Sequence, residues 1–171
     1  MPQVSHSQTI QASPDQVWAI LADVTRLPDW AYTAGRFPHL VEGRYGSEQT
    51  TGAGTLWVGL SVDGQTATQQ ITTWKPAQTL AYTLQATENA PLQISQTNCF
   101  TLEPAGDQTH LTWQVDWALT GGFSLGSLLL RFSGNRAFEE MMVGSLEKLK
   151  QVVEKETTVP EPADSTDLSA D

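Results

Sequence analysis

Hydrophobic and polar residues alternate along several stretches of this chain. Between residues 111 and 119 every odd position is apolar, whereas positions 112, 114 and 116 are polar. A period of two predicts a β-strand with one buried face. Two shorter stretches show the same alternation. The first carries Leu56, Val58 and Leu60, and the second carries Leu80, Tyr82 and Leu84.

Turn residues divide the chain into a series of strands. Asp63-Gly64 is typical of a hairpin turn, and segments that contain proline or glycine break the chain near residues 76, 90 and 105. The predicted strands lie at about 3–11, 54–62, 66–75, 79–86, 92–103 and 108–119, with a further edge strand at 37–45. The inward face of the strand at 92–103 would carry Leu92, Ile94, Gln96, Asn98, Phe100 and Leu102. Two polar amides thus interrupt an otherwise apolar stripe.

Capping residues and an apolar periodicity near 3.6 predict three helices. Ser13 is an N-cap candidate with Pro14 at the first helical position, which starts a short helix. A second short helix is expected at 25–30, and a long amphipathic helix at about 124–155. Gly134 lies between the two halves of the long helix and is expected to mark a bend or break. The order of elements predicts an α+β domain with an antiparallel sheet and a long C-terminal helix.

Charge and composition set the domain organisation. The chain has 171 residues, a net charge of −10 and one cysteine, so it forms no internal disulfide and no cysteine-based metal site. Five acidic residues and no basic residue follow residue 155, which leaves 14 acids and 9 bases, a net charge of −5, for the rest. We therefore expect one domain at 1–155 and a disordered acidic tail at 156–171.

The same features narrow the range of partners. The acidic balance argues against nucleic acid as a partner, because phosphate binding needs clustered Lys and Arg. No apolar run is long enough to cross a bilayer, and the first residues lack the pattern of a secretory signal. We expect a cytoplasmic protein without stable membrane insertion. No histidine spacing typical of a metal site is present, and no metal or other cofactor is expected.

The segment from Ala12 to Trp30 reads ASPDQVWAILADVTRLPDW. It resembles the opening of the polyketide cyclase/dehydrase and lipid-transport family, which belongs to the START and birch-pollen-allergen-like (SRPBCC) superfamily. The similarity extends to residues 106–117 and 139–149, and spans roughly residues 3–153. This resemblance implies a helix-grip fold, in which a curved antiparallel sheet surrounds a long C-terminal helix and two short helices follow the first strand. It also implies a hydrophobic ligand between sheet and helix.

The walls of such a ligand site follow from the inward faces of the strands and of the long helix. The candidate ligand contacts are Leu56, Val58, Leu60, Tyr82, Leu84, Ile94, Asn98, Phe100, Trp113, Val115, Trp117, Phe132, Phe138, Met141 and Met142. Binding pockets are mostly apolar with a few fixed polar groups, and buried amides need partners. The sequence thus favours binding or transport of a small hydrophobic ligand in a cavity above ~300 Å³. The resemblance implies a lipid, polyketide or quinone-like molecule.

Two other functions stay open. A polyketide cyclase or dehydratase would need titratable groups inside the cavity. That function predicts that at least two of five residues converge there: His39, Gln96, Asn98, Arg136 and Glu139. In a protein-interaction module the acidic tail would be either a contact arm or a segment that only adds solubility. No residue is assigned a catalytic role, and a protein partner is not identified.

Overall fold

The computed structural model describes residues 2–31, 37–90, 93–120 and 125–158, apart from the side chains of 125–133. The elements in chain order are β1 (Gln3–Ile10), α1 (Pro14–Leu21), the 3-10 turn η1 (Val24–Arg26), α2 (Leu27–Trp30), β2 (Leu40–Tyr45), β3 (Leu56–Ser61), β4 (Thr66–Lys75), β5 (Thr79–Glu88), β6 (Ile94–Ala105), β7 (Gln108–Leu119) and α3 (Leu125–Thr158). This is the predicted order of a strand, short helices, a strand meander and a long C-terminal helix.

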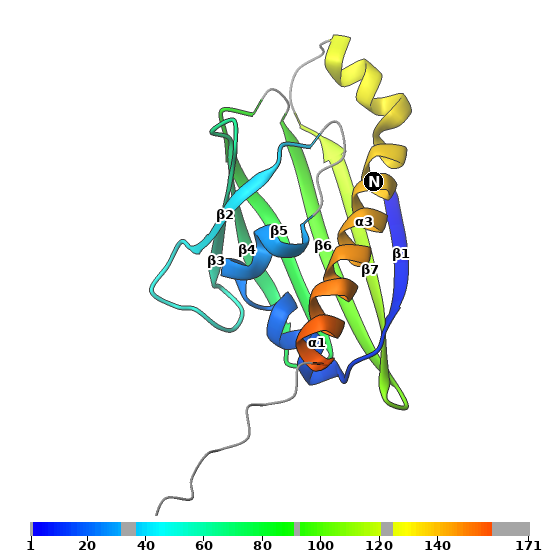
Figure 1. Ribbon diagram of the computed structural model, residues 1–171. Coiled ribbons are helices and arrows are strands. Elements are labelled where there is room, and N and C mark those ends of the chain that lie inside the picture. Colours follow the sequence, from blue (N-terminus) through cyan, green and yellow to red (C-terminus); the bar gives the residue numbers. More distant parts are fainter. Residues whose placement is uncertain (1, 32–36, 91–92, 121–124, 159–171) are drawn as a thin grey trace, which may run out of the picture.

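The seven strands form one antiparallel sheet in the order β1-β7-β6-β5-β4-β3-β2. The first strand of the chain therefore pairs with the last, and β1 and β2 form the two edges. Helix α3 crosses one face of this curved sheet, and the short helices lie beside its C-terminal half (Figure 1). The α+β class and the helix-grip architecture predicted from the sequence are confirmed.

The first short helix begins where its capping residues predict. The Ser13 hydroxyl accepts a hydrogen bond from the Gln16 backbone N–H at 3.4 Å, and the Gln16 side-chain oxygen accepts one from the Ser13 N–H at 2.9 Å. This reciprocal pair is a capping box, with Pro14 in the first turn. The second predicted helix is divided into η1 and the single turn α2, which begins just before Pro28.

The core lies between α3 and the inner face of the sheet. One face of α3 is fully buried and carries Phe138, Met142, Leu146, Leu149 and Val153. On the sheet side, the odd positions of β7 from 111 to 117 are buried, as the alternation predicts. The even positions of β6 face the same core.

Gly134 does not break α3, which runs through it as one helix. A Cβ at this position would overlap Cη2 of Trp117 and lie 2.5 Å from its Cζ2. The glycine therefore allows the helix to approach β7 closely. The expectation of a bend or break at Gly134 was therefore wrong. The residue instead has no side chain because α3 packs closely on Trp117 at this position.

Strand β3 presents the face opposite to the one predicted. Trp57 is 1% exposed and lies in the core with its ring 5.6 Å from that of Tyr82, so Gly59 and Ser61 face inward with it. By alternation, the predicted stripe points to the other face of the sheet, where Leu56 and Leu60 are half-buried and Val58 is 9% exposed. The large indole gains more from burial than the leucines and valine, and it sets the register.

Helix α3 extends three residues beyond its predicted end. Residues 156–158, assigned to the tail from composition, are helical. Arg26 Nη2 donates a hydrogen bond of 2.6 Å to Glu156 Oε1, which ties the end of the helix to η1. The remaining tail, 159–171, lies outside the described residues.

Candidate functional site

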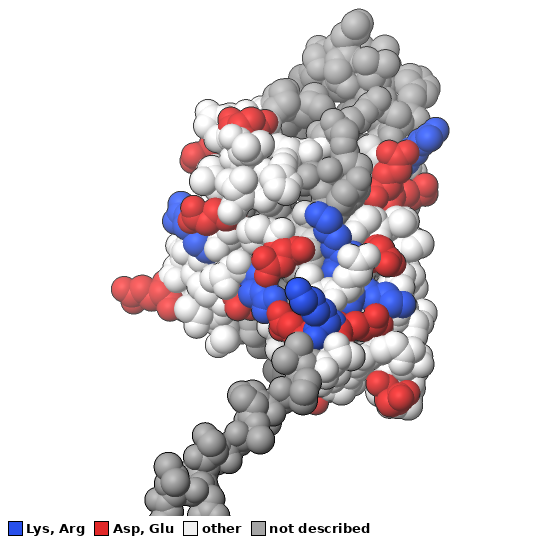
Figure 2. All heavy atoms as spheres, in the orientation of Figure 1, with Lys and Arg blue, Asp and Glu red and all other residues white. Residues whose placement is uncertain are grey.

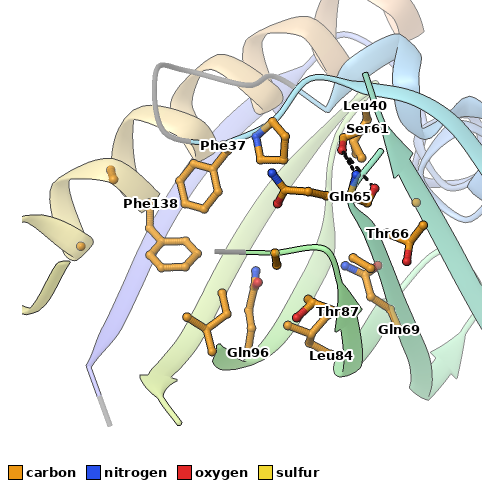
Figure 3. Close-up of a pocket in the computed structure, with 17 residues that line it drawn as sticks. Phe37, Leu40, Ser61, Gln65, Thr66, Gln69, Leu84, Thr87, Gln96 and Phe138 are labelled. Carbon is orange, nitrogen blue, oxygen red and sulfur yellow. Dashed lines mark hydrogen bonds between the residues drawn. The ribbon is translucent and has the colours of Figure 1, made fainter. Parts of the chain in front are cut away.

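A cavity of about 220 Å³ lies between the sheet and α3. Its floor is formed by β3 to β6, one wall by α3, and an adjoining wall by the segment that leads into β2 (Figure 3). The described lining residues are Phe37, Pro38, Leu40, Gly59, Ser61, Gln65, Thr66, Ala67, Gln69, Leu84, Thr87, Ala90, Ile94, Gln96, Gly134, Ala137 and Phe138. The rings of Phe37 and Phe138 meet with centroids 5.1 Å apart and close one side.

The size of the cavity limits what it can hold. Cavities of about 150 Å³ take up benzene, and pockets for drug-sized ligands begin near 300 Å³. The cavity lies between these values. The volume above ~300 Å³ that was expected for binding or transport of a lipid, polyketide or quinone-like ligand is therefore not reached. The cavity fits a molecule of one or two rings.

The hollow forms where the inward side chains are small. Gly59, Ala67 and Thr87 lie side by side across β3, β4 and β5 in the sheet register. Shifts in the β4–β5 register near Gln69 and Ile71 decide which β4 residues face inward. Such bulges have no reliable signature in a single sequence, and the β4 part of the lining was missed for this reason.

Larger side chains fill the inner face deeper in the core. Phe100 and Trp113 stack with ring centroids 4.8 Å apart, and Trp30 meets both rings edge-on. Tyr82 lies against Phe100 at 6.1 Å. Burial raises the pKa of the Tyr82 phenol. None of these four rings is among the described residues that line the cavity, and together they form a packed part of the core.

The predicted ligand contacts therefore separate into groups. Three of them line the cavity: Leu84, Ile94 and Phe138. Seven are buried in the core outside the cavity lining: Tyr82, Asn98, Phe100, Trp113, Val115, Trp117 and Met142. Met141 is half-buried against the core. The three residues of β3 point to the other face of the sheet, and the side chain of Phe132 lies outside the described residues.

The polar lining consists of amides and hydroxyls. No ionisable side chain is found among the described lining residues. Gln96 rises from β6 into the cavity (Figure 3), and its Nε2 donates a hydrogen bond of 3.2 Å to Asn98 Oδ1. The same oxygen accepts a bond of 3.0 Å from Trp113 Nε1. Asn98 thus connects the cavity to the aromatic cluster.

Three buried hydrogen-bond donors lack an acceptor within the described part of the chain. They are the indole N–H groups of Trp30 and Trp57 and the Nδ2 of Asn98. A buried unsatisfied donor costs about 1–3 kcal/mol. All three are donors, so an oxygen from a ligand or from water would satisfy them.

The ionisable candidates for catalysis do not meet at the cavity. His39 and Glu139 are exposed. The Arg136 side chain is 83% exposed and pairs with Glu140 on the helix surface at 2.9 Å. Of the five candidates only the two amides come together, Gln96 at the cavity wall and Asn98 beneath it.

The described part of the chain contains neither a cluster of metal ligands nor a helix that could span a membrane. No group of three or more His, Cys, Asp or Glu within the described ranges is arranged to hold a metal ion. Among the helices described, none combines the length and the apolar character needed to cross a membrane. Charges of both signs gather over the C-terminal half of α3, whereas much of the visible surface over β2 and β3 is uncharged (Figure 2).

A curved antiparallel sheet that grips a long helix, with a cavity between them, defines the START-like helix-grip class. The sequence model of the family described as polyketide cyclase/dehydrase and lipid transport matches residues 1–154. The chain therefore belongs to this family. No curated protein matches it in sequence.

Solved structures share the fold at low sequence identity. The Zhui aromatase/cyclase from Streptomyces sp. R1128 is 20% identical, with a TM-score of 0.73 over 91% of this chain and 95% of its own. A protein from Thermus thermophilus is 16% identical, with a TM-score of 0.70 over 92% and 100%. A START superfamily protein from Mycobacterium smegmatis is 14% identical, with a TM-score of 0.67 over 90% and 97%. These likenesses establish the fold.

Proposed function

We propose that this protein binds a small, mostly apolar molecule of one or two rings in the cavity between the sheet and α3. The observation that carries the proposal is the cavity itself, about 220 Å³ in volume and lined by apolar side chains, hydroxyls and amides. Concave apolar sites with a few fixed polar groups are the usual form of small-molecule sites. Membership of the polyketide cyclase and lipid-transport family supports a ligand of this kind.

Binding is favoured over acid–base catalysis by the chemistry of the lining. General acid–base catalysis needs a titratable group within hydrogen-bond reach of the reacting atoms. The described lining offers amide and hydroxyl groups, which orient a ligand without exchanging protons at neutral pH. The expected cytoplasmic location and the role of the acidic tail in contacting a protein stay predictions.

A cavity-filling variant tests this proposal with 2-naphthol as the probe. Ala67 is half-buried on the cavity floor, and leucine at this position would occupy part of the hollow. Ala86 is exposed on the neighbouring strand, so Ala86→Leu makes the same chemical change outside the cavity. Isothermal titration calorimetry gives the dissociation constant for each protein.

We expect Ala67→Leu to weaken 2-naphthol binding at least tenfold, and Ala86→Leu to leave it unchanged. Both variants should keep the wild-type circular dichroism spectrum. Equal binding by the two variants, or no binding of 2-naphthol to the unaltered protein, would contradict the proposal.

A further inference from the structure

The orientation of the Gln96 and Asn98 amides is fixed by Trp113. An indole N–H only donates hydrogen bonds, so Asn98 must turn its Oδ1 toward Trp113 Nε1, 3.0 Å away. The same oxygen faces Gln96 at 3.2 Å, and Gln96 must therefore present its Nε2. The direction of both bonds is set by one donor-only group in the core.

This orientation decides which polar atoms remain for a ligand. The Gln96 amide directs its nitrogen to Asn98, so its Oε1 is the end that can accept a further hydrogen bond. Asn98 is 1% exposed, and its Nδ2 has no partner within the described part of the chain. Asn98 lies outside the described cavity lining and this nitrogen is buried, so a ligand in the cavity would meet Gln96 Oε1.

The cavity therefore presents an oriented acceptor, Gln96 Oε1, which matches a ligand group that donates a hydrogen bond, such as a hydroxyl. A hydroxyl both donates and accepts, whereas an ether or ketone oxygen only accepts and a hydrocarbon does neither. Fluorine in place of the hydroxyl keeps the shape of a ring compound but removes the donor. A site built to bond a hydroxyl discriminates against an analogue that lacks it, because its own polar groups are then left unpaired.

We propose that Gln96, held in one orientation by Asn98, selects ligands that carry a hydroxyl on an aromatic or otherwise apolar ring, with the hydroxyl at the β6 end of the cavity. This inference rests on the proposed function and names the chemical class of its ligand. Gln69 also lines the cavity, from β4, but within the described part of the chain no hydrogen bond connects it to the core in the way that Asn98 connects Gln96. It is therefore the matched control.

The test compares 2-naphthol with 2-fluoronaphthalene by isothermal titration calorimetry on three proteins. These are the unaltered chain, Gln96→Met and Gln69→Met, in which methionine keeps the length of the side chain and removes the amide. Asn98 keeps its bond to Trp113 in both variants, so the core is not expected to change. Circular dichroism and the thermal midpoint check this.

We expect the unaltered protein to bind 2-naphthol about tenfold more tightly than 2-fluoronaphthalene. Gln96→Met should remove this preference by weakening 2-naphthol alone, and Gln69→Met should retain it. Equal binding of the two probes, or a preference that survives Gln96→Met, would overturn the hydroxyl assignment and leave the proposed function intact. Failure of both probes to bind would overturn both.

Discussion

Replacement of Gly134 by alanine tests how closely α3 lies on the sheet. The added methyl group would overlap Cη2 of Trp117 and lie 2.5 Å from Cζ2. Trp117 cannot easily move, because it is 3% exposed, its Nε1 donates to Asn135 Oδ1 at 3.1 Å, and its ring lies 5.2 Å from that of Phe138. The helix or the indole must therefore shift.

Two opposing contributions set the expected change in the free energy of unfolding. Alanine in place of glycine inside a helix stabilises by about 1 kcal/mol. An extra methyl group forced into a packed interior costs about 1–3 kcal/mol. We expect Gly134→Ala to lower the free energy of unfolding by about 1 kcal/mol, measured by urea denaturation followed by circular dichroism.

A double-mutant cycle isolates the contact from the helix propensity. Phenylalanine at position 117 lacks the outer indole ring atoms that the new methyl group would meet. In the Trp117→Phe background, Gly134→Ala should become neutral or stabilising, with a coupling energy of about 1–3 kcal/mol between the two positions. A stabilisation of about 1 kcal/mol by Gly134→Ala alone, with no coupling, would refute the close approach of α3 to β7.

Three further predictions concern the rest of the fold. Because burial raises the pKa of Tyr82, the unfolded chain loses this proton first, so stability should fall by up to about 1.4 kcal/mol per pH unit above roughly pH 10. For Tyr82→Phe, the free energy of unfolding measured with urea should fall less steeply between pH 8 and 11 than for the unaltered protein. Equal slopes for the two proteins would contradict this. Gly43→Ala would drive its methyl into the Val24 carbonyl oxygen and should cost about 2 kcal/mol or more; an unchanged thermal midpoint would argue against that packing. Glu156→Gln removes an exposed partner of Arg26 and should cost less than about 1 kcal/mol, an effect that vanishes in 1 M NaCl; a larger, salt-independent loss would show a different role.

The parts of the fold that were predicted correctly depend on patterns among residues that are close in the sequence. The nine-residue alternation that ends at Leu119 fixes both the strand and its buried face, because no other register buries Trp113 and Trp117 together. The capping box at Ser13 and Gln16 is complete within four residues. Each of these signals depends only on neighbouring residues, so a single sequence is enough to identify them.

Other parts depend on contacts between distant residues. In β3 the apolar residues are nearly continuous, and the inward face is settled by the packing of Trp57 on Tyr82, which lies two strands away in the sheet. Gly134 indicates flexibility in the sequence, but its close contact with Trp117 appears only when α3 is laid on β7. These choices could not be made before the sheet was assembled.

The candidate site was predicted with the wrong emphasis. Large apolar residues such as Phe100 and Trp113 were expected to surround the ligand, yet large side chains fill space and form the core. The hollow lies where Gly59 and Ala67 leave room, and neither was singled out. Gln96 drew attention in the sequence because a polar residue on an inward apolar stripe is unusual. This pattern correctly pointed to a residue that lines the cavity.

The most direct test of the account is a methyl-resolved NMR titration with 2-naphthol. Leu84 and Ile94 line the cavity, whereas Leu111 and Leu146 are fully buried in the core. We expect the methyl signals of Leu84 and Ile94 to shift with a saturable dose response, and those of the two core leucines to stay nearly unchanged. Shifts confined to Leu56, on the other face of the sheet, or no shifts at all, would contradict a ligand site between the sheet and α3.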